Sequence, residues 1–143
     1  MKTEQITAAS IESLVHVFYD KVRADALLGP VFARMLEGQW DKHLPRMVDF
    51  WSSILLRTGS FQGNVYGKHM ALEGIGEQHF VHWLTLFKQT VETLYGDAAA
   101  TEILTVADRI AASLQLGFFG ERAVNLASID NQNMALKLPA LSR

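Results

Sequence analysis

The sequence has 143 residues, the length of one domain, and its 49% of hydrophobic residues can supply a sizeable core. Thirteen basic and 15 acidic side chains leave a formal net charge of −2, which lacks the electrostatic footprint of a protein that binds nucleic acid or an anionic membrane. Cysteine is absent, which excludes disulfides, thiolate metal sites, iron–sulfur clusters and cysteine nucleophiles. Because the sequence shows neither a signal-peptide pattern nor a run of about 18 apolar residues, we expect a soluble cytoplasmic protein.

The spacing of apolar residues predicts an all-α fold, since long segments follow a period of 3.6 residues and only three prolines occur. One apolar face runs through residues 11–22, and Thr7 or Ser10 can cap the start of that helix. The Gly29-Pro30 pair interrupts the pattern, so we expect Leu28 in a turn and a short helix to Leu36.

Further helices are expected in the second half of the chain. One starts at Trp40, carries Pro45 in its first turns and is ended by Gly59. A loop and a short helix with His69 and Leu72 follow, then a long helix from about residue 80 to 96 and a last helix capped by Asp97. Residues 1–123 are predicted to form the domain, and residues 124–143 form a tail with weak periodicity.

Two histidines are candidates for one site. The helix after His43 rises about 22 Å, and the eleven residues from Gly59 to His69 can extend to about 36 Å, so both imidazoles can face one gap. Aromatic residues would line this gap: Phe18, Tyr19, Phe32, Trp51 and Trp83. A flat apolar cofactor would fit there, although histidines and aromatic rings at helical spacing are also ordinary core residues.

Other candidate sites are weaker. Glu77, His79 and His82 have a spacing that suits a metal ion, but no third ligand is evident. The Ser52-Ser53 pair lacks a nucleophile elbow, and there is no phosphate-binding glycine loop. Arg46, one turn after His43, can reach a carboxylate at a cleft mouth.

Six motifs occur in order between about residues 6 and 120: Phe18-Tyr19-Asp20-Lys21-Val22-Arg23, Leu28-Gly29-Pro30-Val31-Phe32, Trp40-x-x-His43, Asp49-Phe50-Trp51 with Leu55-Leu56, Lys68-His69-Met70-Ala71-Leu72 and Phe80-x-x-Trp83-Leu84-x-Leu86-Phe87. Any one of these motifs is a weak sign of a family, but six of them in the same order are a specific one. Together they resemble the group III truncated haemoglobins. The resemblance implies a two-over-two helical sandwich around haem b.

The same resemblance implies roles for individual residues. His69 matches the proximal iron ligand, Tyr19 and Trp83 match the distal polar positions, and His43 matches the distal histidine that acts as a gate. Arg46 matches a basic position near a haem propionate. The remaining residues expected to contact the cofactor are Phe32, Met47, Trp51 and Leu72.

A proximal histidine leaves the sixth position of haem iron open for O₂, NO or CO. Donors such as Tyr19 and Trp83 would hold a polarised ligand by about 1.5 to 3 kcal/mol each and slow its release. Two functions stay open: reversible binding of diatomic ligands, or oxidation–reduction of NO or peroxide with a separate reductase, because the sequence shows no flavin or nicotinamide domain. A haem-free helical interaction module is a third interpretation.

Overall fold

The computed structural model describes residues 2–59, 61 and 75–119, and over these residues the chain is helical with no named strand. The helices of this part are α1 (Ala8–Ala24), α2 (Leu28–Leu36), α3 (Trp40–Leu55), α5 (Glu77–Leu94) and α6 (Asp97–Phe119). The predicted all-α class is therefore confirmed. The short helix expected around His69 and Leu72 and the tail from 124 to 143 lie outside the described residues.

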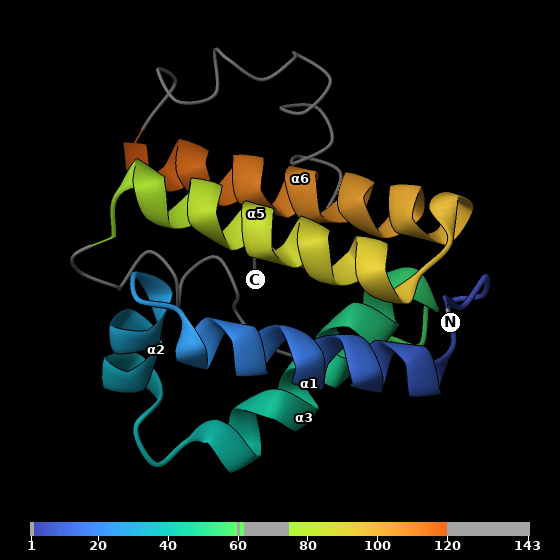
Figure 1. Ribbon diagram of the computed structural model, residues 1–143, viewed down its shortest axis with the longest axis horizontal. Coiled ribbons are helices and arrows are strands. Elements are labelled where there is room, and N and C mark those ends of the chain that lie inside the picture. The colour runs from blue at the N-terminus through green and yellow to red at the C-terminus, as the bar shows by residue number, and fades with distance from the viewer. Residues whose placement is uncertain (1, 60, 62–74, 120–143) are drawn as a thin grey trace.

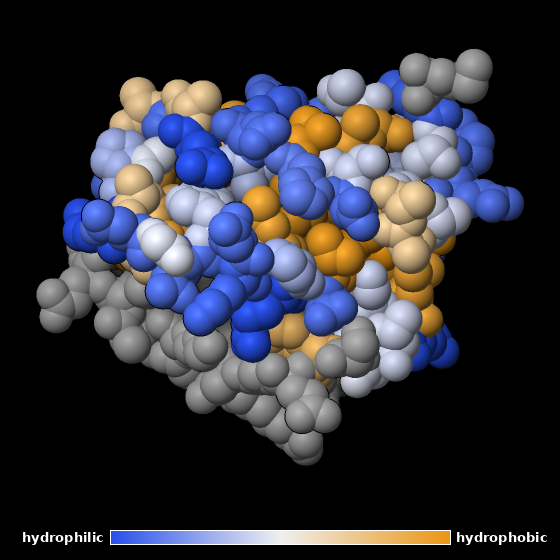
Figure 2. Space-filling model, turned by 90° about the horizontal axis from the view of Figure 1, so that it is seen from below, coloured by the Kyte–Doolittle hydropathy of each residue, from blue (hydrophilic) through white to orange (hydrophobic). Residues whose placement is uncertain are grey.

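The helices form two layers. In Figure 1, α5 and α6 lie side by side in one layer, and α1 crosses α3 in the other. Helix α1 packs against α2, α3 and α5, whereas α5 packs against α6, so α1 and α5 join the layers. This is the two-over-two arrangement that the resemblance to truncated haemoglobins implied. Seen from below in the view of Figure 1, hydrophobic residues are exposed in the middle of this face among hydrophilic ones (Figure 2).

Helix α1 begins with a reciprocal cap. The Thr7 hydroxyl accepts from the Ser10 backbone N–H at 3.1 Å, and the Ser10 hydroxyl accepts from the Thr7 N–H at 2.9 Å. Thr7 is thus the N-cap, and Ser10 completes the capping box. The apolar face that follows is buried in the core: Ile11, Leu14, Val15, Phe18, Tyr19 and Val22.

The corner after α1 differs from the prediction, because Leu28 is the first residue of α2 and does not lie in a turn. The Asp25 carboxylate accepts from the backbone N–H groups of Leu27 at 3.0 Å and Leu28 at 2.9 Å. These bonds satisfy amides at the helix start, and Pro30 falls in the first turn, where its missing N–H costs little. Gly29 lets the two helices approach closely, since a Cβ there would lie 2.8 Å from the Arg23 carbonyl oxygen.

Helix α3 starts at Trp40 as predicted but ends at Leu55, four residues before Gly59. Arg57 adopts the left-handed conformation with φ 56°, and the Thr58 N–H reaches back to the Ser52 carbonyl at 3.5 Å. These features are those of a left-handed C-terminal cap, so a residue other than glycine ends the helix. Pro45 lies in the second turn, on the exposed side.

The last two helices match the predicted long segments. Helix α5 begins after Gly76, and α6 begins at Asp97 itself, so Asp97 occupies the first turn and not the cap position. An acidic side chain in the first turn still interacts favourably with the helix dipole. The buried residues of these helices complete the core between the layers: Phe80, Phe87, Val91, Ile103, Ala107, Ile110 and Leu114.

Candidate functional site

A cavity of about 420 Å³ lies between the two layers, a size that suits a bound organic ligand. All five described helices contribute to its wall. The wall is mostly apolar, and its hydrophobic residues are Leu28, Val31, Phe32, Met35, Leu36, Met47, Phe50, Trp51, Phe61, Ile75, Phe80, Trp83, Ile110, Ala111 and Leu114. The cavity is therefore suited to a large apolar group.

The structure brings most of the predicted site residues to this one cavity. Those that line it are Tyr19, Phe32, His43, Arg46, Met47, Trp51 and Trp83. His69 and Leu72 lie outside the described residues. Phe18, which was expected in the wall, is 1% exposed and packs behind it against Tyr19, Trp83 and Phe87. Consecutive residues of a helix point about 100° apart, so Tyr19 faces the cavity while Phe18 faces α5.

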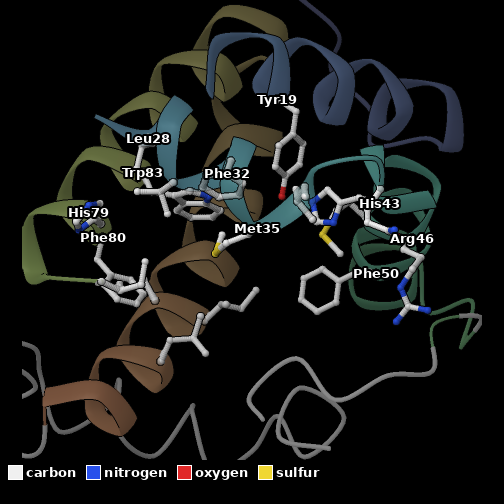
Figure 3. Close-up of a pocket in the computed structure, with 18 of the residues that line it drawn as sticks. Tyr19, Leu28, Phe32, Met35, His43, Arg46, Phe50, His79, Phe80 and Trp83 are labelled. Carbon is white, nitrogen blue, oxygen red and sulfur yellow. The ribbon is translucent and has the colours of Figure 1, made fainter. Parts of the chain in front are cut away.

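Tyr19 and His43 lie next to each other at the cavity. Their ring centroids are 5.0 Å apart at an interplanar angle of 88°, and in Figure 3 the Tyr19 hydroxyl points into the cavity from α1. Burial raises the pKa of the Tyr19 hydroxyl above its ordinary value. The phenol consequently stays protonated and can donate a hydrogen bond into the cavity.

Trp83 is held by a stack of aromatic rings. It lies parallel to Phe87, with centroids 5.0 Å apart at 5°, and Phe87 lies in turn against Trp51 at 5.1 Å and 17°. Phe18 adds an edge contact to Trp83 at 5.3 Å. Because the ring is packed on its face and its edge, its orientation in the wall is restricted.

Basic side chains stand at separate ends of the cavity. Arg46 and Lys42 come from exposed positions of α3, and the Arg46 guanidinium carbon lies 5.4 Å from the Phe61 ring centroid. His79 lies at the other end, far from Arg46 in Figure 3. The spacing of residues in the sequence did not point to His79 as part of this cavity, because His79 stands out there only within a metal-like pattern. Its Nδ1 accepts from the Gly76 N–H at 2.9 Å, so a neutral ring carries its proton on Nε2.

The histidines of the metal-like spacing take part in separate contacts. His82 Nε2 lies 2.6 Å from Asp25 Oδ1, while His79 caps its own helix. Burial would raise the pKa of Asp25, but the N–H groups of Leu28 and Leu27 and the His82 side chain together bring it below its ordinary value. Within the described ranges there is no group of three His, Asp or Glu side chains that could hold a metal ion.

No protein-family model matches the sequence. A curated group 3 truncated haemoglobin of Campylobacter jejuni is 34% identical over 118 residues, and the alignment covers 80% of this chain and 93% of that protein. The crystal structure of a group III truncated haemoglobin from Campylobacter jejuni superposes with a TM-score of 0.76 over the same shares of the two chains. This chain belongs to the group III truncated haemoglobins.

As a truncated haemoglobin, the protein is a globin-type haem protein, and its family implies diatomic ligands such as O₂. The cavity fits haem in three respects. Its walls from both layers are apolar and aromatic, and a protonated phenol points into it. Arg46 and Lys42 also lie where porphyrin carboxylates could find cationic partners.

No helix of the described ranges combines the length and apolarity needed to span a bilayer.

Proposed function

We propose that this truncated haemoglobin holds haem b and binds O₂ and other diatomic ligands reversibly in the cavity between its helical layers. The observation that carries this proposal is the convergence of Tyr19, His43 and Trp83 on one apolar cavity, each from a different helix. When bound, haem supplies a ferrous iron with an open coordination position for O₂, NO or CO, with His69 as the proximal ligand in this proposal.

Different side chains of the cavity would hold the cofactor and the small ligand. In the proposal, Phe32, Met47 and Trp51 contact the apolar faces of the cofactor together with Leu72, and Arg46 pairs with a propionate at the cavity mouth. Arg46 is exposed, so this pair would contribute about 1 kcal/mol or less.

The distal residues act on the small ligand. The Tyr19 hydroxyl and the Trp83 indole N–H are the two proposed donors, and hydrogen bonds are stronger in such an apolar cavity than in water. His43, next to Tyr19, would act as the gate that controls access to them.

A second function is favoured by the buried phenol of Tyr19. A donor that burial keeps protonated retains a polar ligand strongly, and slow release suits a carrier poorly. The alternative is therefore an oxidoreductase that acts on NO or peroxide, with electrons from a separate reductase.

The absorption spectrum of the purified protein tests whether it holds haem b. We expect a strong band near the blue edge of the visible range that shifts on reduction and again on addition of CO, and the spectrum of the pyridine complex should identify haem b. A protein that takes up no haem when haem is added would refute the proposal. Consumption of NO or peroxide by the loaded protein, with an electron donor present, would favour the second function.

A further inference from the structure

A tryptophan outside the cavity contacts two of the residues that face it. Trp40, the first residue of α3, lies edge-on to Tyr19 and to His43, with ring centroids 5.9 Å apart in both pairs. Since Tyr19 and His43 also contact each other at 5.0 Å, the three rings form a closed triangle. Trp40 is not among the residues that line the described cavity, although it contacts two residues that do.

An arginine holds this tryptophan from the surface. The Arg23 guanidinium carbon lies 4.5 Å from the centroid of the Trp40 ring, in a cation–π contact between α1 and α3. Arg23 follows Tyr19 by four residues, so both side chains lie on the same face of α1, one turn apart. Trp40 and His43 have the equivalent relationship on α3, at a spacing of three residues.

We propose that Trp40, held in place by Arg23, is a positioning residue that keeps His43 and Tyr19 in their inward orientation and thereby slows ligand access. A ring that turns away must give up its contacts, and the His43 ring has both Tyr19 and Trp40 as neighbours. The position of the gate is thus set partly by an exposed cation on α1. This inference rests on the proposed function, because it assigns a role to residues that face the ligand.

Replacing either partner tests the arrangement. Trp40→Leu removes the ring, and Arg23→Gln removes the cation while leaving the buried residues unchanged. We expect the association rate of CO, measured by flash photolysis, to rise about two- to five-fold in Arg23→Gln and further in Trp40→Leu. Arg23→Lys keeps a cation, so its rate should stay closer to the native value. The control is Lys21→Gln, which removes a positive charge from the same turn of α1 without disturbing the described contact on Trp40.

A purely structural role for Trp40 would lower stability without changing the distal environment. The C–O stretching bands of the CO complex separate these cases, because they report the distribution of polar groups around the ligand. We expect additional or broader bands in Trp40→Leu and Arg23→Gln, and a native spectrum in Lys21→Gln. Association rates and band patterns that stay native in both Trp40→Leu and Arg23→Gln would overturn the proposal.

The ring-proton NMR shifts of His43 give a measurement that needs no haem. Tyr19 and Trp40 both perturb these shifts through their ring currents, so loss of the arrangement moves them towards exposed values. If the purified protein takes up no haem, the proposed function fails. The role of Trp40 can then still be tested by the His43 shifts. Because Trp40→Leu removes one of these rings outright, Arg23→Gln is the variant that decides, and native His43 shifts in it would refute the role of Trp40.

Discussion

The His82 ring and the Asp25 carboxylate are within hydrogen-bond distance, with 2.6 Å between Nε2 and Oδ1, and this contact joins α5 to the corner between α1 and α2. The other carboxylate oxygen of Asp25 accepts from the first amides of α2. Asp25 therefore holds the start of the helix that supplies Leu28 and Phe32 to the cavity, and it ties that start to the helix of Trp83.

The first prediction follows from the lowered pKa of Asp25. A carboxyl whose pKa is lower in the folded state stabilises the fold above its ordinary pKa of 3.8, and this stability is lost as the pH falls below that value. The native protein should thus lose unfolding free energy on acidification, and Asp25→Asn, which keeps a capping oxygen but no charge, should lose less. Urea unfolding between pH 3 and 7 measures the unfolding free energy of both proteins.

Asp25→Ala should in addition lose about 1 kcal/mol of unfolding free energy at pH 7, because this variant also lacks the oxygen that caps α2. Identical pH profiles for native protein and Asp25→Asn would contradict the role of the charge.

The second prediction concerns His69, the proposed iron ligand. His69→Ala should fail to retain haem or should need added imidazole to do so, since the variant has no side chain to bind the iron. Absorption spectra before and after gel filtration show retention, and His79→Ala is the control because His79 also belongs to the described cavity wall. Unchanged retention and an unchanged ferrous spectrum in His69→Ala would disprove the assignment.

Third, Tyr19→Phe removes the hydroxyl and keeps the ring packed, so the O₂ dissociation rate should rise about ten- to a hundredfold. Trp83→Phe should act in the same direction. Because both donors would serve one ligand, the double variant should show less than the sum of the two free-energy changes. Stopped-flow displacement of O₂ by CO gives the rates. A Tyr19→Phe protein that releases O₂ at the native rate would exclude Tyr19 as a donor.

Fourth, His43→Ala should change the association rate of CO or O₂ more than the dissociation rate, as expected for a gate. The side chain is half-buried beside Tyr19, so its removal opens space without removing the phenol. Photolysis and stopped-flow kinetics separate the two rates. Strongly accelerated O₂ release in His43→Ala, with native release in Tyr19→Phe, would make His43 the anchor instead.

Fifth, Gly29→Ala should lower the unfolding free energy by about 1 to 3 kcal/mol, because the new methyl group would meet the Arg23 carbonyl oxygen at 2.8 Å. Helix propensity acts in the opposite direction, since alanine is favoured over glycine by about 1 kcal/mol. Urea denaturation measures the balance. A variant as stable as the native protein would show that α1 and α2 can separate at little cost.

The sequence by itself determined the helical class, and its motifs pointed to several of the residues that face the cavity. Helical periodicity depends on neighbours three and four residues apart, so the apolar faces of α1, α3 and α5 could be recognised from spacing. The cap at Thr7 is equally local, because its partner Ser10 lies three residues away. Motif order then pointed to Tyr19, His43 and Trp83, which the structure places at one cavity.

Only the tertiary structure decided the contacts between distant segments. The start of α2 at Leu28 depends on Asp25, whose carboxylate is also held by His82, 57 residues further along the chain. The placement of Phe18 behind the cavity wall and the contact of Arg23 with Trp40 depend on how α1 is rotated against α5 and α3. Sequence periodicity shows which face of a helix is apolar, but the packing of the layers selects which side chain of that face meets the cavity and which meets another helix.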